Sequence, residues 1–389
     1  MTLRQKIEWE IQERGPMPFS RYMELCLYDP ELGYYSRNVE QFGKAGDFYT
    51  SSDVHAVFGR LLARQFEEMW RALGSPGKIE ILELGPGRGL FARDVLDWSE
   101  KKFPEFFHAL HYLLVENSPA LRRRLQLTLD KHFTAGKATL GQIRGGVASY
   151  VATPVQNAGL ELQGPVIVFA NEFFDALPVE VLSSEGSLRI AARDGRFIEL
   201  WATPSAVELA FLDRYGVHPE VGECVDAPLV AQAYMCEIAA GLRRGFLIAI
   251  DYGYCRDELL AGRHRGTVTA FRQHSVGTPY EAPGEQDITA HVNFTALSAA
   301  AVQNGMRVEP LLTQSQILLG VGEQNQFEDA FEACRLPQER AKVALQLKHL
   351  VTPAGMGESF HVLIASKGVA AEQVSRLSGL SFGRPDPSR

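Results

Sequence analysis

A glycine-rich turn preceded by a carboxylate occupies residues 83–89, which read E-L-G-P-G-R-G. Glycines at this spacing permit a tight bend and let the main chain approach a ligand closely. The helix expected after the turn would present free N–H groups to the same ligand. Glu116, at the end of the next expected strand, could accept hydrogen bonds from both hydroxyls of a ribose. We therefore predict a nucleoside-containing cofactor held by Glu83, Gly85, Pro86, Gly87, Gly89, Glu116 and Asn117.

The residues around this turn favour one cofactor over another. The motif G-x-G-x-x-G is typical of a dinucleotide site, and its last glycine would fall where this chain has Leu90. Glu83 would add negative charge beside a pyrophosphate, which is unfavourable. The same carboxylate suits S-adenosylmethionine, which has an amino-acid end and no phosphate, and whose product is S-adenosylhomocysteine. A purely structural glycine turn and a nicotinamide-dependent oxidoreductase are the alternatives.

Short apolar strands alternate with helical segments from residue 78 onward. The strands are expected over 79–84, 111–116, 145–153, 166–170, 246–250, 306–312 and 360–366. Such alternation predicts an α/β fold with a doubly wound, mostly parallel sheet. In sheets of this kind, ligands bind beyond the carboxyl ends of the strands, where the strand order reverses. The glycine turn follows the first of these strands and is therefore expected at that edge.

The composition excludes several classes of protein. The chain has 389 residues, of which 46% are apolar, and a formal net charge of −8. An acidic chain is poorly suited to coating phosphate backbones, so nucleic acid is not an expected partner. The five cysteines have no C-x-x-C spacing, so we expect neither a disulfide framework nor a metal site.

The sequence pattern contains no recognisable targeting or membrane segment. No apolar run approaches the roughly 18 residues that a membrane-spanning helix needs. Residues 1–14 mix Arg4, Lys6 and Arg14 with glutamates, whereas a secretory signal needs an apolar run and a transit peptide avoids acids. We therefore expect a cytoplasmic protein that does not insert into a membrane.

Six segments together resemble one known family. They are E-L-G-P-G-R-G (83–89), V-E-N-S-P (115–119), A-N-E-F-F-D-A-L-P-V (170–179), G-K-A-G-D-F-Y-T-S-S (43–52), I-D-Y-G-Y (250–254) and P-G-E-Q-D-I-T-A-H-V-N-F-T-A-L (283–297). They are similar to the MidA family of class I methyltransferases, from about Gly15 to Lys367. That family includes the mitochondrial complex I assembly factor. The resemblance implies a Rossmann-like class I methyltransferase fold and an S-adenosylmethionine site. For the mitochondrial member, it implies methylation of an arginine on a complex I subunit.

In this fold, the loop after the fourth strand faces the transferred methyl group. Here that loop begins Asn171-Glu172-Phe173-Phe174-Asp175. Methyl transfer is an in-line displacement at a positive sulfonium, so positioning supplies most of the catalysis. Glu172 could accept two hydrogen bonds from a planar guanidinium, and aromatic faces suit a passing cation. We predict Glu172 as the substrate anchor, Asp175 as its support or a cofactor contact, and Asn171 in the cofactor site. In the alternative, Asn171 and Asp175 cap a following helix and the phenylalanines fill the core.

Further candidates lie outside this loop. His291, in an insertion that could border the site, could accept the departing proton, although a lone histidine also serves structural roles. Asp47 and Thr50 belong to an aromatic loop over 33–52, which could close over the cofactor as a lid or simply pack. Asp251, after another apolar strand, is expected at the same edge, where it could also cap a turn. We count His291 with the catalytic candidates, and Asp47 and Thr50 with the cofactor contacts.

The chain is expected to divide into three parts. Residues 1–75 form a helical region with the lid loop, 76–367 form the Rossmann-like domain that binds S-adenosylmethionine, and 368–389 form a flexible tail. Insertions at about 183–235 and 255–350 would build the substrate cleft and a homodimer surface.

Together these observations predict an S-adenosylmethionine-dependent methyltransferase that acts on an arginine side chain of a protein. A respiratory complex I subunit is the partner that the resemblance implies. The rival interpretation is a non-catalytic assembly chaperone, which would bind the cofactor or a partner protein without methylating it.

Overall fold

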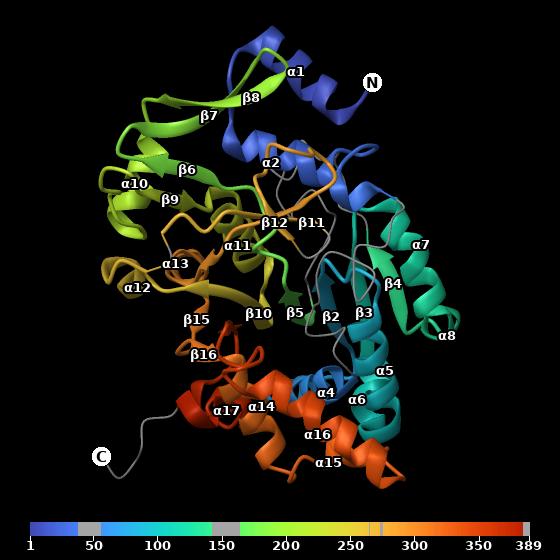
Figure 1. Cartoon of the computed structure of the whole chain (residues 1–389). Coiled ribbons are helices and arrows are strands. Elements are labelled where there is room, and N and C mark those ends of the chain that lie inside the picture. Colours follow the sequence, from blue (N-terminus) through green and yellow to red (C-terminus); the bar gives the residue numbers. More distant parts are fainter. Residues whose placement is uncertain (38–55, 142–163, 264, 273–274, 384–389) are drawn as a thin grey trace.

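A computed structural model describes residues 1–37, 56–141, 164–263, 265–272 and 275–383 (Figure 1). Its centre is a sheet with the strand order β15 (Arg307–Val308), β17 (Phe360–Lys367), β10 (Arg244–Tyr254), β5 (Pro165–Asn171), β2 (Ile79–Leu84), β3 (Leu110–Val115) and β4 (Ala138–Gly141). Two short strands extend this sheet. Strand β14 (Val292–Asn293) pairs with β10, and strand β16 (Leu312–Thr313) pairs with β17. From β10 to β4 all neighbours are parallel, whereas β17 is antiparallel to β10.

Alternate residues of the central strands bury opposite faces of this sheet. In β5, Ile167 and Phe169 belong to one core cluster, and Val166 and Val168 belong to another. The first face is covered by α4 (Ala56–Ala72), α5 (Leu90–Lys102), α6 (Pro104–Ala109), α14 (Gln314–Glu323), α15 (Glu328–Phe331) and α16 (Pro337–Val351). The second face is covered by α11 (Leu229–Gly241) and α13 (Phe294–Gln303). Helices on both faces and a strand order that reverses at β2 confirm the predicted doubly wound, mostly parallel sheet.

A second, antiparallel sheet lies beside the first and carries the N-terminal helices (Figure 1). Its order is β1 (Met17–Pro18), β7 (Gly186–Arg193), β6 (Glu180–Ser183) and β9 (Cys224–Ala227), with β8 (Arg196–Ala202) paired to β7. Apolar residues of α1 (Leu3–Arg14) and α2 (Phe19–Tyr28) share one cluster with this sheet and with a small third sheet, β12 (Ser275–Gly277), β11 (Thr269–Arg272) and β13 (Asp287–Thr289). The connecting helices are η1 (Tyr34–Ser36), α7 (Pro119–Thr128), α8 (Asp130–Thr134), α10 (Ala206–Arg214) and α12 (Arg256–Leu260).

The position of α4 differs from the predicted division at residue 75. The Phe66 ring of α4 lies 5.5 Å from the ring of Phe169 in β5, edge to face, and α4 packs along α5. This helix therefore covers the central sheet, because its apolar stripe needs that core for burial. Among the described residues of the predicted N-terminal region, it is α1, β1, α2 and η1 that pack with the second sheet.

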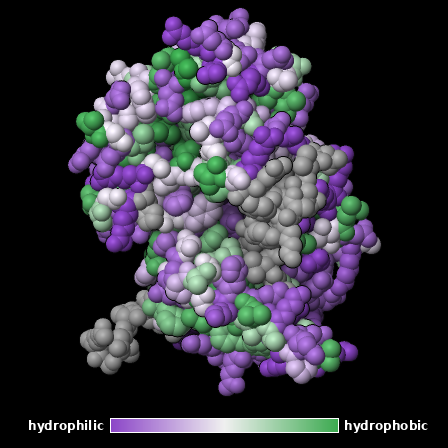
Figure 2. Space-filling model, viewed as in Figure 1, coloured by the Kyte–Doolittle hydropathy of each residue, from purple (hydrophilic) through white to green (hydrophobic). Residues whose placement is uncertain are grey.

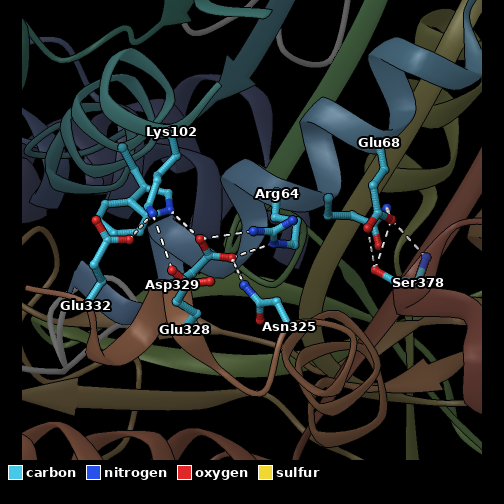
Figure 3. Close-up of polar contacts among 10 residues, drawn as sticks. Arg64, Glu68, Lys102, Asn325, Glu328, Asp329, Glu332 and Ser378 are labelled. Carbon is cyan, nitrogen blue, oxygen red and sulfur yellow. Dashed lines mark hydrogen bonds and ion pairs between the residues drawn. The ribbon is translucent and has the colours of Figure 1, made fainter. Parts of the chain in front are cut away.

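The C-terminal segment is also packed more tightly than we expected. It contains α17 (Ala371–Val374) and a 3₁₀ helix, η3 (Ser378–Gly383). Figure 3 shows Glu68 of α4 with Ser378: the carboxylate accepts the Ser378 amide at 2.8 Å and its hydroxyl at 2.8 Å. Leu377 and Leu380 are buried in the same core as α4. Residues 371–383 therefore do not form part of the flexible tail that was expected over 368–389, because their apolar side chains pack into the core.

We predict that truncation after Gly368 lowers the free energy of unfolding by about 4 kcal/mol, because burial of each large aliphatic side chain contributes about 1.5–3 kcal/mol. Urea unfolding followed by circular dichroism measures the change. The matched control removes only residues 384–389, and we expect its unfolding midpoint to equal that of the full chain. Equal midpoints for both truncations would contradict a stabilising role of this segment.

Large apolar side chains such as Trp9, Leu127 and Val221 are exposed, but on the face drawn in Figure 2 apolar residues form small separate groups within a largely hydrophilic surface. Within the part of the chain that the structure describes, no helix is both long and apolar enough to cross a bilayer.

Candidate active site

The glycine turn lies where β2 meets α5, at the carboxyl edge of the central sheet. Gly85, Gly87 and Gly89 have φ angles of +64°, +53° and +75°, a region that residues with a Cβ rarely adopt. The Gly89 amide donates to the Pro86 carbonyl at 2.9 Å, and Gly89 is the N-cap of α5. The bend therefore needs glycine at these positions, and the first amides of α5 have no acceptor within their own helix.

Glu116 follows β3 and lies beside this turn, because β2 and β3 are paired neighbours. Its Oε1 accepts the amide of Ser118 at 2.8 Å. Burial raises the pKa of Glu116 to about 7, against the opposing effect of the amides of Ser118, Asn117 and Gly87. The structure thus brings the glycine turn and this carboxylate together, as the spacing in the sequence predicts.

Glu83, which the sequence predicts as a cofactor contact, is deeply buried in the structure. Its side chain is buried, and its Oε2 accepts the hydroxyl of Tyr112 at 2.8 Å. Burial, together with the charge of Glu116, raises the pKa of Glu83 to about 8, against the opposing effect of the Tyr112 hydroxyl. Glu83 is therefore mostly protonated at neutral pH unless a cation lies nearby. Its contact with a cofactor stays a prediction.

These residues fit a cationic nucleoside better than a pyrophosphate. At Gly85 a Cβ would lie 3.0 Å from Cδ2 of Phe173, so glycine lets the loop after β5 pack closely against the turn. Glu83 and Glu116 both have raised pKa values because they are buried, and a nearby positive charge favours their ionised forms. S-adenosylmethionine carries a sulfonium and an ammonium group, whereas a pyrophosphate would add negative charge to the pair.

The loop after β5 is held by the neighbouring strand β10. Asp251, which is fully buried in β10, accepts on Oδ2 the amides of Phe173 (3.2 Å), Phe174 (3.0 Å) and Asp175 (3.2 Å). The next element along the chain is β6, so the alternative in which Asn171 and Asp175 cap a helix is not what the structure shows. Asp251 does cap a turn, but this turn lies in the loop after β5 and not at the end of its own strand, β10.

Glu172 has the most unusual backbone of this loop. Its φ is +50°, and a non-glycine residue held there costs about 1–3 kcal/mol, a strain that is common at functional sites. The Glu172 amide donates to the Ile250 carbonyl at 2.9 Å, and its Oε1 accepts the side-chain amide of Asn171 at 3.1 Å. The carboxylate is partly exposed. Phe174 is buried in the core, whereas Phe173 is only partly buried.

Asp175 is a buried carboxyl with one oxygen in use. Its Oδ2 accepts the hydroxyl of Tyr252, and its Oδ1 has no hydrogen-bond partner within the described residues. Burial raises the pKa of Asp175 to about 6, although the Tyr252 hydroxyl favours the ionised form. The pKa of Asp251 is also raised well above its usual value, first by burial and then by the charges of Asp175 and Glu172. Asp175 Oδ1 is therefore a buried acceptor whose hydrogen-bonding capacity is not used by the described residues.

The remaining predicted site residues are His291, Asp47 and Thr50. The ring of His291 meets the ring of Tyr252 edge to face at 5.4 Å, so His291 borders the Asp175 side of the site. Its amide donates to Thr267 Oγ1 at 2.8 Å. Asp47 and Thr50 lie outside the described residues.

Two tyrosines from the N-terminal region were not among the predicted site residues. Tyr28 donates its hydroxyl to the Ala176 carbonyl at 2.9 Å, and Tyr35 donates to Asp287 Oδ1 at 2.9 Å. Burial raises the pKa of Tyr28, and the charges of Asp175, Asp287 and Glu116 raise it further. Tyr28 therefore lies near both the cofactor side and the loop after β5. The only sequence signal was the tyrosine-rich start of the predicted lid loop.

A family profile described as "Putative S-adenosyl-L-methionine-dependent methyltransferase" matches residues 61–311. The chain is 30% identical to "Protein arginine methyltransferase NDUFAF7 homolog, mitochondrial" of Drosophila melanogaster, over 98% of this chain and 88% of the relative. It is 27% identical to "Protein arginine methyltransferase NDUFAF7, mitochondrial" of Homo sapiens, over 91% of this chain and 80% of the relative.

The whole chain resembles a solved structure. It is a crystal structure of a "likely methyl transferase" from Burkholderia thailandensis bound to S-adenosyl-homocysteine. The TM-score is 0.79 at 26% identity, and the match covers 100% of this chain and 96% of that one. The overall likeness confirms the predicted methyltransferase fold.

The prediction of a cytoplasmic protein is wrong. The curated relatives from fly and human, which match more than nine-tenths of this chain, are both named as mitochondrial proteins. The prediction failed because well-separated cysteines and a charged N-terminus do not distinguish one reducing compartment from another.

Proposed function

The chain belongs to the MidA-like family of S-adenosyl-L-methionine-dependent methyltransferases, and we propose that it methylates an arginine side chain of a protein. One observation carries this proposal: the loop with Glu172 and Asp175 lies against the glycine turn, with Phe173 beside Gly85. Two carboxyls next to the cofactor turn suit a cationic acceptor. The names of the fly and human relatives support the same acceptor.

On the cofactor side, the chain supplies backbone and carboxylates. Gly85, Gly87 and Gly89 would let the main chain approach the ligand, with Pro86, Asn117 and Asn171 lining it. Glu116 would accept the ribose hydroxyls. Glu83 would ionise in the presence of the ammonium end, because a cation offsets the effect of burial on its pKa. When bound, S-adenosylmethionine supplies a methyl group on a positively charged sulfur.

On the substrate side, the two carboxyls have separate tasks. Glu172 would accept two N–H groups of the guanidinium and hold its plane toward the methyl group. The rings of Phe173 and Tyr28 would flank the cation. A guanidinium nitrogen that gains a methyl group must lose a proton, and Asp175 Oδ1 is a buried acceptor with no donor among the described residues. His291, which borders Tyr252, is the alternative acceptor for that proton.

For the partner, we propose a protein subunit of a respiratory complex, with a complex I subunit as the first candidate from the family resemblance. An assembly chaperone that binds this partner without methylating it is the competing proposal. The two differ in whether a methyl group reaches the partner protein. The experiment below separates them.

The purified chain is incubated with S-adenosylmethionine that carries a deuterated methyl group and with protein from cells that lack this chain. We expect the label in methylated arginine after acid hydrolysis, and peptide mass spectrometry then assigns it to a subunit. The matched control is Gly87→Val, which should transfer nothing. Label in lysine or in base-labile esters would contradict the arginine acceptor, and cofactor binding without any label would favour the chaperone.

A further inference from the structure

Asp251 connects the end of β10 to the loop after β5. Its side chain has no exposed surface. Oδ2 accepts the amides of Phe173, Phe174 and Asp175 at 3.2, 3.0 and 3.2 Å, and Oδ1 accepts the amide of Tyr252 at 3.0 Å. Hydrogen bonds to a charged acceptor are stronger than neutral ones. One side chain therefore sets the backbone of three consecutive loop residues that lie 76 to 78 positions away in the sequence.

The same strand also fixes the other side of Glu172. Asn171 pairs in register with Ile250 of β10, and the Glu172 amide donates to the Ile250 carbonyl. Glu172 is thus held between a strand pair on one side and the three amides bound by Asp251 on the other. A non-glycine residue keeps a left-handed backbone conformation only where neighbouring contacts hold it there. β10 supplies those surroundings.

Tyr252, the next residue of β10, acts on a side chain of the loop rather than on its backbone. Its hydroxyl donates to Asp175 Oδ2, and Oδ1 is the oxygen that has no hydrogen-bond partner among the described residues. Its ring is packed edge to face between His291, at 5.4 Å, and Phe360, at 5.5 Å. The direction of the Asp175 carboxyl is therefore set from β10 as well.

We infer that Asp251 is a positioning residue of the methyl-transfer site, which directs the Glu172 and Asp175 carboxyls by holding the amides of residues 173–175. The inference rests on the proposed function, in which those carboxyls face the acceptor. Asp251 does not need to touch the cofactor or the substrate for this role. Its loss should affect the transfer step far more than cofactor binding.

The test compares Asp251→Asn with Asp329→Asn. Asp329 is also a buried carboxylate with several donors, namely Arg64, Trp98 and Asn325, but it links α4 to α15, away from the strand ends (Figure 3). The asparagine variants keep the side-chain shape and, at either place, replace one acceptor oxygen with an NH2 group that cannot accept a hydrogen bond. Both are expected to lower thermal stability, so only the site-specific readouts differ.

For Asp251→Asn, we expect hydrogen exchange of segment 172–176 to accelerate at least about tenfold. The rate constant kcat for label transfer should fall about 100-fold, with KM for S-adenosylmethionine and Kd for S-adenosylhomocysteine within about threefold. Asp329→Asn should leave all of these near the wild-type values. Unchanged exchange in 172–176, or parallel loss of cofactor affinity and transfer, would overturn the inference.

The wild-type chain provides a second measurement in case Asp251→Asn does not fold. The amides of Phe173, Phe174 and Asp175 belong to an irregular loop, yet they should exchange as slowly as those of β5. Fast exchange of these three amides would refute the inference without any variant. If the wild-type chain transfers no methyl group to arginine, the proposed function fails, whereas the exchange result still reports whether Asp251 holds the loop.

Discussion

Gly87→Val lowers the affinity for S-adenosylhomocysteine by at least about 100-fold, or about 2.7 kcal/mol, in isothermal titration at pH 7.5. Gly87 has a φ of +53°, and a branched residue held in that region is strained. Its amide also favours the ionised form of Glu116. A valine would relieve its strain by turning the backbone, and that change would move the amide away from Glu116. The cofactor site would then lose both the shape of the turn and the orientation of the Glu116 carboxylate.

Gly136→Val is the matched control for this variant. Gly136 has a φ of +67° and nothing within 4 Å of the position of a Cβ. It precedes β4 and therefore lies at the amino edge of the sheet, opposite the glycine turn. Valine there should cost about 1–3 kcal/mol of stability and leave the affinity for S-adenosylhomocysteine unchanged. Equal loss of affinity in both variants would mean that backbone strain alone explains the effect at Gly87.

The central sheet and the glycine turn could be predicted from the sequence because their signals are local. Apolar runs of strand length alternate with helical segments, and three glycines at fixed spacing follow the first run. Strand pairing then requires Glu116 to lie beside the turn, because Glu83 and Leu84 pair with Leu114 and Val115. The predicted loop after β5 likewise follows from the position of β5 next to β2.

Contacts between distant segments could not be predicted in the same way. Asp251 was expected at the right edge of the sheet, but only the structure assigns its acceptor oxygen to three amides of another loop. Tyr28 and Tyr35 enter the site because α2 packs on the second sheet and turns its end toward β5. The order of residues 371–383 depends on acceptors supplied by α4. No local pattern specifies any of these partners.

Electrostatics explains why the two halves of the site can act together. Glu83 and Glu116 on the cofactor side, and Asp175 and Asp251 on the substrate side, all have raised pKa values because they are buried. Without a ligand, this many carboxyls repel one another. A cationic cofactor and a cationic side chain each favour the ionised forms. Binding of either cation should therefore be accompanied by proton release from the protein.

Asp175→Asn should reduce kcat for methyl transfer about 100-fold or more, as expected for loss of a group that takes up the proton, and leave the Kd for S-adenosylhomocysteine unchanged. In the wild-type chain, Asp175 must be ionised to accept the proton. Its pKa in the ligand-free chain is about 6 because of burial, so kcat/KM should rise tenfold per pH unit below about pH 6 and level off above it. The asparagine variant should lack this acidic limb. Rates measured from pH 5 to pH 8.5 provide the test.

The stability of this variant separates a functional role from a structural one. Because burial raises the pKa of Asp175 from 3.8 to about 6, its ionised form destabilises the folded chain above pH 6, so asparagine should not lower the melting temperature at pH 8. Glu172→Gln is the matched comparison: as the anchor, it should raise KM for the acceptor protein and keep the acidic limb. Persistence of that limb in Asp175→Asn would assign the proton to another group, with His291 next in position, and a parallel fall in stability and transfer would make Asp175 a structural residue.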